Sequence, residues 1–189
     1  MKRFLLPLGA FILLVVVLIV GLKHAPDKET IKSPLIGKSA PEFNLPKLID
    51  VGQNLDASAL RGGWHLVNVW ATWCVTCREE HATLLEIQRQ GQVPIVGIDW
   101  KDEDASALSW LAQLGNPYQV VLADRDGRVA IDFGVYLAPE SFLVNPAGII
   151  VEKQYGAMTM DDWQNKFLSH VRSSAPAGSA APATAAAGA

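Results

Sequence analysis

The chain has 189 residues, a formal net charge of −3, a hydrophobic fraction of one half and only two cysteines. Without Lys2 and Arg3 the remainder carries a charge of −5 and shows no basic patch, which argues against nucleic acid as a partner. Two cysteines also exclude a four-cysteine zinc site.

The N-terminal segment has the pattern of a membrane anchor. Lys2 and Arg3 precede an apolar run from Phe4 to Leu22, which as a helix is about 28 Å long at ~1.5 Å per residue, enough for the hydrocarbon core of a bilayer. A cleaved signal peptide has a shorter apolar core and a small-residue cleavage site, which is missing here, so we expect a retained anchor over residues 1–24. The positive end predicts that the rest of the chain lies across the membrane, in the periplasm of a bacterial cell, tethered to the inner membrane.

The remaining chain divides into a linker, one domain and a tail. Residues 25–34 are mostly polar and predict a linker. Residues 173–189 contain only Ala, Pro, Gly, Ser and Thr, which cannot build a core, so we expect a disordered tail. Residues 35–172 have the size of a single domain and show no internal repeat.

Apolar periodicity and turn residues predict alternating strands and helices across this domain. The expected elements are a hairpin over 41–46 and 51–55, a helical turn at 56–60, a strand at 65–71, a helix at 78–90, a strand at 93–100, a helix at 104–114, a strand at 118–122, a helix at 128–133, a hairpin over 141–145 and 149–155, and a helix at 159–171. This order predicts an α/β domain in which helices flank a central mixed sheet.

The two cysteines, Cys74 and Cys77, stand two residues apart where a predicted strand gives way to a helix pattern. Unpaired N–H groups and the helix dipole at that position favour a thiolate and lower the pKa of the first thiol. The second sulfur lies one turn further on, close enough to close a small disulfide. A Cys-x-x-Cys beside a βαβ pattern indicates a thioredoxin-like fold and a thiol–disulfide exchange site.

Two other interpretations of the pair remain open. A structural disulfide is one, although so small a loop adds little stability by chain entropy. A partial soft-metal site is the other, because Cys74, Cys77 and His81 share a helix face; no obvious fourth ligand follows. We therefore expect no metal, and no cofactor beyond the redox-active disulfide itself.

At this point the sequence resembles a known family, the membrane-anchored thioredoxin-like proteins of cytochrome c maturation called CcmG or DsbE. The segments that carry the resemblance are Trp70–His81, the stretches Asp99–Asp102, Ala107–Leu111 and Leu114–Tyr118, then Gly134–Leu143, and finally Gly148–Ile150. Gly134–Leu143 is the most specific of them, and with the anchor the resemblance covers about residues 1–172. Two departures stand out: Val75 replaces the usual Pro, which affects the redox poise, and Leu137 replaces the usual Gly beside the expected substrate loop.

The resemblance implies a mechanism. Cys74 is the exposed attacking thiolate, which forms a mixed disulfide with the substrate, and Cys77 is the buried thiol that resolves it. Pro139 is expected in the cis form, facing the cysteines, with Ala138 presenting backbone groups to an extended substrate.

Three further side chains complete the predicted site. Trp73 is expected to shield the thiol and, with Glu140, to contact the substrate. Thioredoxins usually carry an acid beneath the resolving cysteine, and here that position is Asn68, which cannot take a proton. Glu80 or Glu140 is therefore the expected substitute base, the alternative for Glu80 being an ordinary solvated helix residue.

The resemblance also implies a function and partners. The chain is expected to reduce disulfides in the Cys-x-x-Cys-His segment of apocytochrome c, or in a CcmH-like thiol protein of the same system, with electrons from a membrane reductase of the CcdA or DsbD type. A TlpA- or ResA-like reductant with other substrates is the alternative enzyme. A Sco-like copper chaperone is the alternative from another class, and its spacing of three residues between cysteines weighs against it. The anchor and the Gly134–Leu143 segment weigh against a DsbA-like oxidant.

Overall fold

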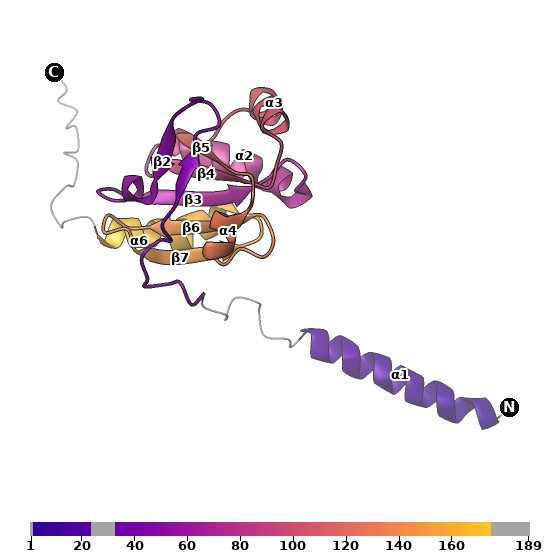
Figure 1. Cartoon of the computed structure of the whole chain (residues 1–189). Helices are drawn as coiled ribbons and strands as arrows, with labels where there is room; N and C mark the ends of the chain where they lie inside the picture. Colours follow the sequence, from indigo (N-terminus) through magenta and orange to yellow (C-terminus); the bar gives the residue numbers. More distant parts are fainter. Residues whose placement is uncertain (1, 24–32, 175–189) are drawn as a thin grey trace, which may run out of the picture. The chain divides into compact units, whose positions relative to one another are not determined.

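The computed structural model describes residues 2–23 and 33–174, in two units that divide between Lys32 and Ser33 (Figure 1). The first unit is the helix α1, Lys2–Lys23, so the helical part of the N-terminal prediction is confirmed. Across the described ranges, however, no helix has both the length and the apolarity required to cross a membrane, and the predicted transmembrane helix is not confirmed. Residues 25–32 of the predicted linker and residues 175–189 of the predicted tail lie outside the described residues, as does residue 24 at the end of the predicted anchor.

The second unit is built on a mixed five-stranded sheet, as the sequence predicts. A small antiparallel pair, β1 (Asn44–Pro46) and β2 (Asn54–Asp56), precedes it. The main sheet has the order β5-β4-β3-β6-β7, with β3 in the centre. Its strands are β3 (His65–Trp70), β4 (Ile95–Trp100) and β5 (Val120–Asp124), which are parallel, and β6 (Glu140–Val144) and β7 (Ile150–Tyr155), which form an antiparallel hairpin.

The helices follow the predicted order along the chain. They are η2 (Ala57–Leu60), α2 (Val75–Gln90), α3 (Asp104–Leu114), α4 (Arg128–Asp132), and a final helical segment made of α5 (Met160–Asp162), a π turn η3 (Trp163–Phe167) and α6 (Leu168–Ser173). The bounds of α3 are those predicted. Helix α2 begins three residues earlier than predicted because Cys74, a residue type that is not a usual helix cap, caps it.

The sheet separates two hydrophobic cores, because successive side chains of a strand point to opposite faces. Leu66 and Trp70 of β3 pack in one core with α2, α3 and the final helical segment. Val67 and Val69 pack in the other core with α4 and the β1–β2 region. The same alternation places Asn68 on the α2 face of the central strand, below the start of that helix.

An aromatic stack under this face positions Tyr118. Its ring stacks on Trp70 with centroids 5.4 Å apart and planes 19° from parallel. Gly97 in β4 leaves room for this stack, since a Cβ there would lie 2.8 Å from the Tyr118 ring. The tyrosine hydroxyl is thereby directed toward the centre of β3.

Candidate active site

The cysteine pair lies at the junction of β3 and α2 and forms a disulfide, with the two Cα atoms 5.3 Å apart. Cys74 is the N-cap of α2 and has an extended backbone, and its sulfur accepts a hydrogen bond of 3.1 Å from the backbone N–H of Cys77. After reduction, this N–H and the helix dipole stabilise negative charge on Cys74 Sγ. The geometry therefore supports Cys74 as the nucleophile.

The loop that precedes β6 faces the disulfide. Ala138–Pro139 is a cis peptide bond, as the resemblance predicts, and the Ala138 carbonyl oxygen lies 3.3 Å from Cys74 Sγ. This contact corrects one expectation: Cys74 is not an exposed residue, because only 6% of it is accessible. Both cysteines are buried, and the carbonyl of Ala138 narrows the approach to the outer sulfur.

Glu80 is the acid below the cysteines, one helical turn after Cys77. It is only 1% exposed, so the interpretation as a solvated helix residue is wrong. Its two carboxylate oxygens each accept a 2.9 Å hydrogen bond, one from Asn68 Nδ2 and one from the backbone N–H of Met158. Burial raises the pKa of Glu80 to about 7, against the lowering effect of these two bonds. A carboxyl group with this pKa can take or release a proton near neutral pH.

Asn68 is fixed by a network that the sequence did not reveal. Tyr118 donates its hydroxyl to Asn68 Oδ1 at 2.9 Å, and Asn68 Nδ2 also donates to Ser141 Oγ at 3.0 Å. All four residues of the network, Tyr118, Asn68, Ser141 and Glu80, are buried. Asn68 and Ser141 stand opposite each other in the β3–β6 register. Knowledge of that register would have identified Ser141 as a partner of Asn68.

Glu140 lies inside the domain rather than at its surface. Its carboxylate is buried beneath the Gly134–Pro139 loop and pairs with Lys153 Nζ at 2.7 Å. Burial raises the pKa of Glu140, while Lys153 and the backbone N–H groups of Tyr136 and Leu137 lower it. The Glu140 side chain is therefore not presented at the surface, because β6 turns it inward toward a buried cation, and its contact with a substrate stays a prediction.

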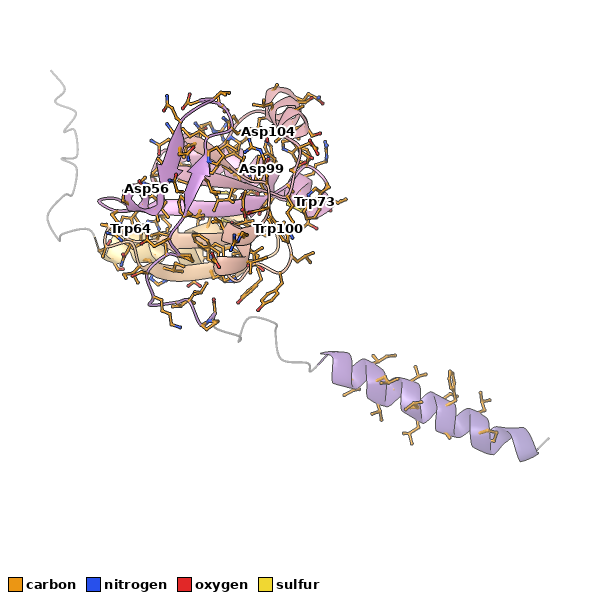
Figure 2. The ribbon with its side chains drawn as sticks, viewed as in Figure 1. Asp56, Trp64, Trp73, Asp99, Trp100 and Asp104 are labelled. Carbon is orange, nitrogen blue, oxygen red and sulfur yellow. A yellow bond between two sulfur atoms is a disulfide. The ribbon has the colours of Figure 1, made fainter. Side chains whose placement is uncertain are left out.

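Trp73 forms the outer rim of the site. It is half exposed, donates from Nε1 to the Lys101 carbonyl at 3.1 Å, and its ring lies 5.6 Å from that of Trp100. Figure 2 shows Trp73, Trp100, Asp99 and Asp104 on the same side of the domain. The expected cover over Cys74 is thus partial, since much of the indole faces solvent.

An open pocket adjoins Trp73. It has a volume of about 900 Å³ and is lined by Trp73, Lys101, Asp102, Glu103, Asp104, Ala105 and Arg125. Thr72 donates both its backbone N–H and its hydroxyl to the Asp102 carboxylate, which ties the active-site loop to the β4–α3 connection. Asp99, near the end of β4, is also buried, and its burial together with the nearby carboxylates of Asp102 and Asp104 raises its pKa to about 8.

His81 is occupied by contacts of its own. Its Nε2 lies 3.0 Å from the Gly115 carbonyl, and its Nδ1 lies 3.5 Å from Trp110 Nε1. Both ring nitrogens therefore have partners other than a metal. Within residues 2–23 and 33–174, no group of three His, Cys, Asp or Glu side chains is arranged to hold a metal ion.

Known proteins similar to this chain carry the same chemistry in their names. The Redoxin family model matches residues 35–166. The chain is 48% identical to a thiol:disulfide interchange protein DsbE of Allochromatium vinosum, over 86% of this chain and 88% of that protein. The DsbE proteins of Pseudomonas aeruginosa and Escherichia coli are 44% and 41% identical, over 88% and 87% of this chain and 92% and 91% of theirs.

Solved structures agree with the fold. The crystal structure of a putative thiol:disulfide interchange protein DsbE from Chlorobium tepidum matches with a TM-score of 0.63 at 23% identity, over 73% of this chain and 96% of that one. At this identity the likeness concerns the fold alone, which is thioredoxin-like. With the relatives above and a Cys-x-x-Cys disulfide at the start of α2, the chain belongs to the DsbE family of Redoxin-domain thiol-disulfide oxidoreductases.

Proposed function

We propose that the protein is a periplasmic dithiol reductant that opens disulfides in the Cys-x-x-Cys-His segment of apocytochrome c, or in a CcmH-like thiol protein, before haem attachment. The observation that carries the proposal is the arrangement of the disulfide at the start of α2, between the Ala138 carbonyl and the buried acid Glu80. The names of the DsbE relatives support the interchange chemistry.

The reaction begins with the reduced cysteine pair. Cys74 thiolate attacks one sulfur of the substrate disulfide, which forms a mixed disulfide and releases one substrate thiolate. Cys77 loses its proton to Glu80 and attacks Cys74 Sγ, which closes the Cys74–Cys77 disulfide and releases the second substrate thiolate. Both substrate thiolates take up protons, so the substrate gains two electrons and two protons. A membrane reductase of the CcdA or DsbD type then restores the dithiol.

Electron transfer to a peptide tests this function. Reduced protein mixed with an oxidised Cys-x-x-Cys-His peptide should give peptide dithiol and oxidised protein, measured by alkylation and mass spectrometry. The equilibrium potential against glutathione should be reducing, well below the about −120 mV of the oxidant DsbA. A peptide with Ala in place of the His is the control for recognition of the haem-binding sequence. A strongly oxidising potential, with electrons passing from peptide dithiol to protein, would contradict the proposal.

We also propose that the N-terminal segment holds the domain at the periplasmic face of the bacterial inner membrane. The support comes from the sequence, in which Lys2 and Arg3 precede the apolar run Phe4–Leu22. A variant lacking residues 1–24 should leave the membrane fraction and exchange thiols in solution at the parent rate, because the site lies wholly within residues 33–174. Loss of exchange in a well-folded variant, or the same fractionation as the parent, would argue against this role.

A further inference from the structure

A buried ion pair lies beneath the loop that faces the disulfide. The side chains of Lys153 and Glu140 are only 2% and 4% exposed, and Lys153 Nζ lies 2.7 Å from Glu140 Oε2. Burying such a pair is costly, because both charges lose their water, and it rarely stabilises a fold more than apolar side chains of the same size do. A role other than stability is therefore to be sought in the groups that this pair contacts.

The pair contacts the Gly134–Pro139 loop at several points. Lys153 Nζ donates to the Gly134 carbonyl at 3.1 Å, at the start of the loop. The backbone N–H groups of Tyr136 and Leu137, in its middle, face the Glu140 carboxylate and lower its pKa, against the raising effect of burial. Val135 and Ala138 anchor the two ends of the loop by burial, but Tyr136 and Leu137 are 88% and 71% exposed, so burial of side chains does not hold its middle. The Lys153–Glu140 pair lies beneath this middle part and contacts the backbone there.

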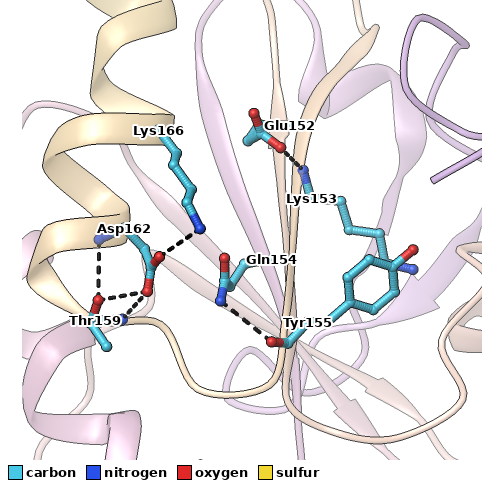
Figure 3. Close-up of polar contacts among 7 residues, drawn as sticks. All are labelled: Glu152, Lys153, Gln154, Tyr155, Thr159, Asp162 and Lys166. Carbon is cyan, nitrogen blue, oxygen red and sulfur yellow. Dashed lines mark hydrogen bonds and ion pairs between the residues drawn. The ribbon is translucent and has the colours of Figure 1, made fainter. Parts of the chain in front are cut away.

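Lys153 itself is confined by its neighbours. In the β6–β7 register it stands opposite Phe142, and its ammonium lies 4.9 Å from the centre of that ring and 4.4 Å from the centre of the Tyr155 ring. Figure 3 shows the Lys153 side chain running alongside Tyr155. An ammonium with two aromatic faces, a carboxylate and a carbonyl around it has little freedom to move.

The end of this loop is the wall of the active site. The Ala138 carbonyl lies 3.3 Å from Cys74 Sγ, and the Pro139 carbonyl accepts a 2.9 Å bond from the Gly156 N–H, just beyond β7. Any displacement of the loop therefore moves the group that lies against the attacking sulfur. A disulfide within a peptide must pass this wall together with its backbone, whereas a small aromatic disulfide presents no backbone to it.

We propose that Lys153 is a positioning residue that, through Glu140 and the Gly134 carbonyl, fixes the Gly134–Pro139 loop for the docking of peptide disulfides at Cys74. The inference rests on the exchange chemistry of the cysteine pair and applies to any peptide disulfide. It does not depend on apocytochrome c being the substrate. In the reaction measured, the peptide disulfide breaks to two thiols, and the Cys74 and Cys77 thiols close to a disulfide.

The test compares Lys153→Met with Lys153→Arg in the full chain. Methionine keeps an unbranched side chain of nearly the same length and removes the ion pair with Glu140 and the hydrogen bond to Gly134, whereas arginine keeps a cation that can reach both partners. For a disulfide peptide we expect Lys153→Met to raise KM about tenfold at nearly unchanged kcat, the effect of one lost charge-assisted hydrogen bond. Lys153→Arg should restore KM to within about threefold of the parent.

Two readouts separate positioning from a general loss of structure. The rate with 5,5′-dithiobis(2-nitrobenzoate), a small disulfide, and the equilibrium potential against glutathione should both stay at the parent values in Lys153→Met. Lys166→Met is the matched control, because Lys166 pairs with Asp162 at 2.9 Å on the final helical segment, as Figure 3 also shows. That control should leave KM for the peptide unchanged.

Removing one partner of a buried pair leaves a buried charge and can unfold a protein. If Lys153→Met does not fold, the double variant Glu140→Gln with Lys153→Met replaces it, since it buries no charge and the introduced amide still offers an oxygen to the loop N–H groups. An unchanged peptide KM in the folded variant would overturn the proposal. So would an equal loss on the peptide and on the small disulfide. If the parent protein reduces other disulfide peptides but not the Cys-x-x-Cys-His peptide, the proposed substrate is wrong. The role of Lys153 is then tested with one of those other peptides.

Discussion

Replacing Cys77 with serine or alanine is expected to stop the reaction at a mixed disulfide between Cys74 and the peptide. Cys74 caps α2 and its sulfur already accepts the Cys77 N–H, so the helix terminus stabilises its thiolate. Without the second thiol nothing within the chain releases the peptide. Mass spectrometry of the reduced variant mixed with an oxidised Cys-x-x-Cys-His peptide should show about one peptide captured per chain.

The matched variant is Cys74→Ser, which should capture no peptide and reduce none. Its remaining thiol, Cys77, lies inside the first turn of α2 and is buried. Because Cys74 itself is only slightly accessible, the experiment also tests whether the Ala138 wall admits a peptide to that sulfur. Capture through Cys77 in the Cys74→Ser chain would show that the two roles are reversed and that the helix terminus does not determine which thiol attacks.

Glu80→Gln is expected to remove a step from the pH dependence of peptide reduction. With its pKa raised to about 7 by burial, Glu80 is mostly protonated below that pH and can accept the Cys77 proton only above it. In the parent, the resolution rate should therefore rise through pH 7. In the variant this rise should be absent and the rate above pH 7 lower by about a hundredfold, the low end for a positioned base. Stopped-flow measurement of mixed-disulfide decay gives the rate directly.

The same substitution should change how stability depends on pH. Between the ordinary glutamate pKa of 4.5 and the folded value of about 7, the folded state binds more protons at Glu80 than the unfolded state does. The free energy of unfolding therefore falls as pH rises through this window, by about 3 kcal/mol from this group. Denaturant unfolding should show that the free energy of unfolding falls between pH 5 and pH 8 by about 3 kcal/mol more in the parent than in the variant. Glu79→Gln, on the exposed side of the same helix, is the control and should change neither curve. Parallel curves for Glu80→Gln would mean that Glu80 does not titrate in this range.

Much of the fold follows from local patterns. The short, mostly apolar run of β3 and the 3.6-residue pattern of α3 depend on neighbours within the same segment, so their bounds could be predicted closely. The position of the cysteines at a helix start followed for the same reason. The π turn Trp163–Phe167 could not be predicted, since the sequence there has the pattern of an ordinary helix.

The site was harder to predict, because its environment comes from distant segments. Glu80 appears in the sequence among charged residues, and only the Met158 N–H and the Asn68 amide show that it is buried. Glu140 was placed toward the substrate because its motif adjoins the loop, and only the opposing strand β7 supplies the lysine that holds it inside. The low exposure of Cys74 likewise depends on Ala138, which a local pattern cannot place.

The parts of the site are far apart along the chain, which has a consequence for biosynthesis. Ala138 follows Cys74 by 64 residues, and Met158 follows Glu80 by 78. The polypeptide is synthesised from its N-terminus. Both cysteines are therefore present long before Ala138, which lies against Cys74, and Met158, whose N–H binds Glu80, have been added. At that stage Glu80 is hydrated and has ordinary acidity, and the cysteines form an ordinary dithiol in an open segment. The environment that sets the reactivity of the site is complete only when the last third of the chain has been added. The same two cysteines therefore have different thiol chemistry in the nascent chain and in the folded enzyme.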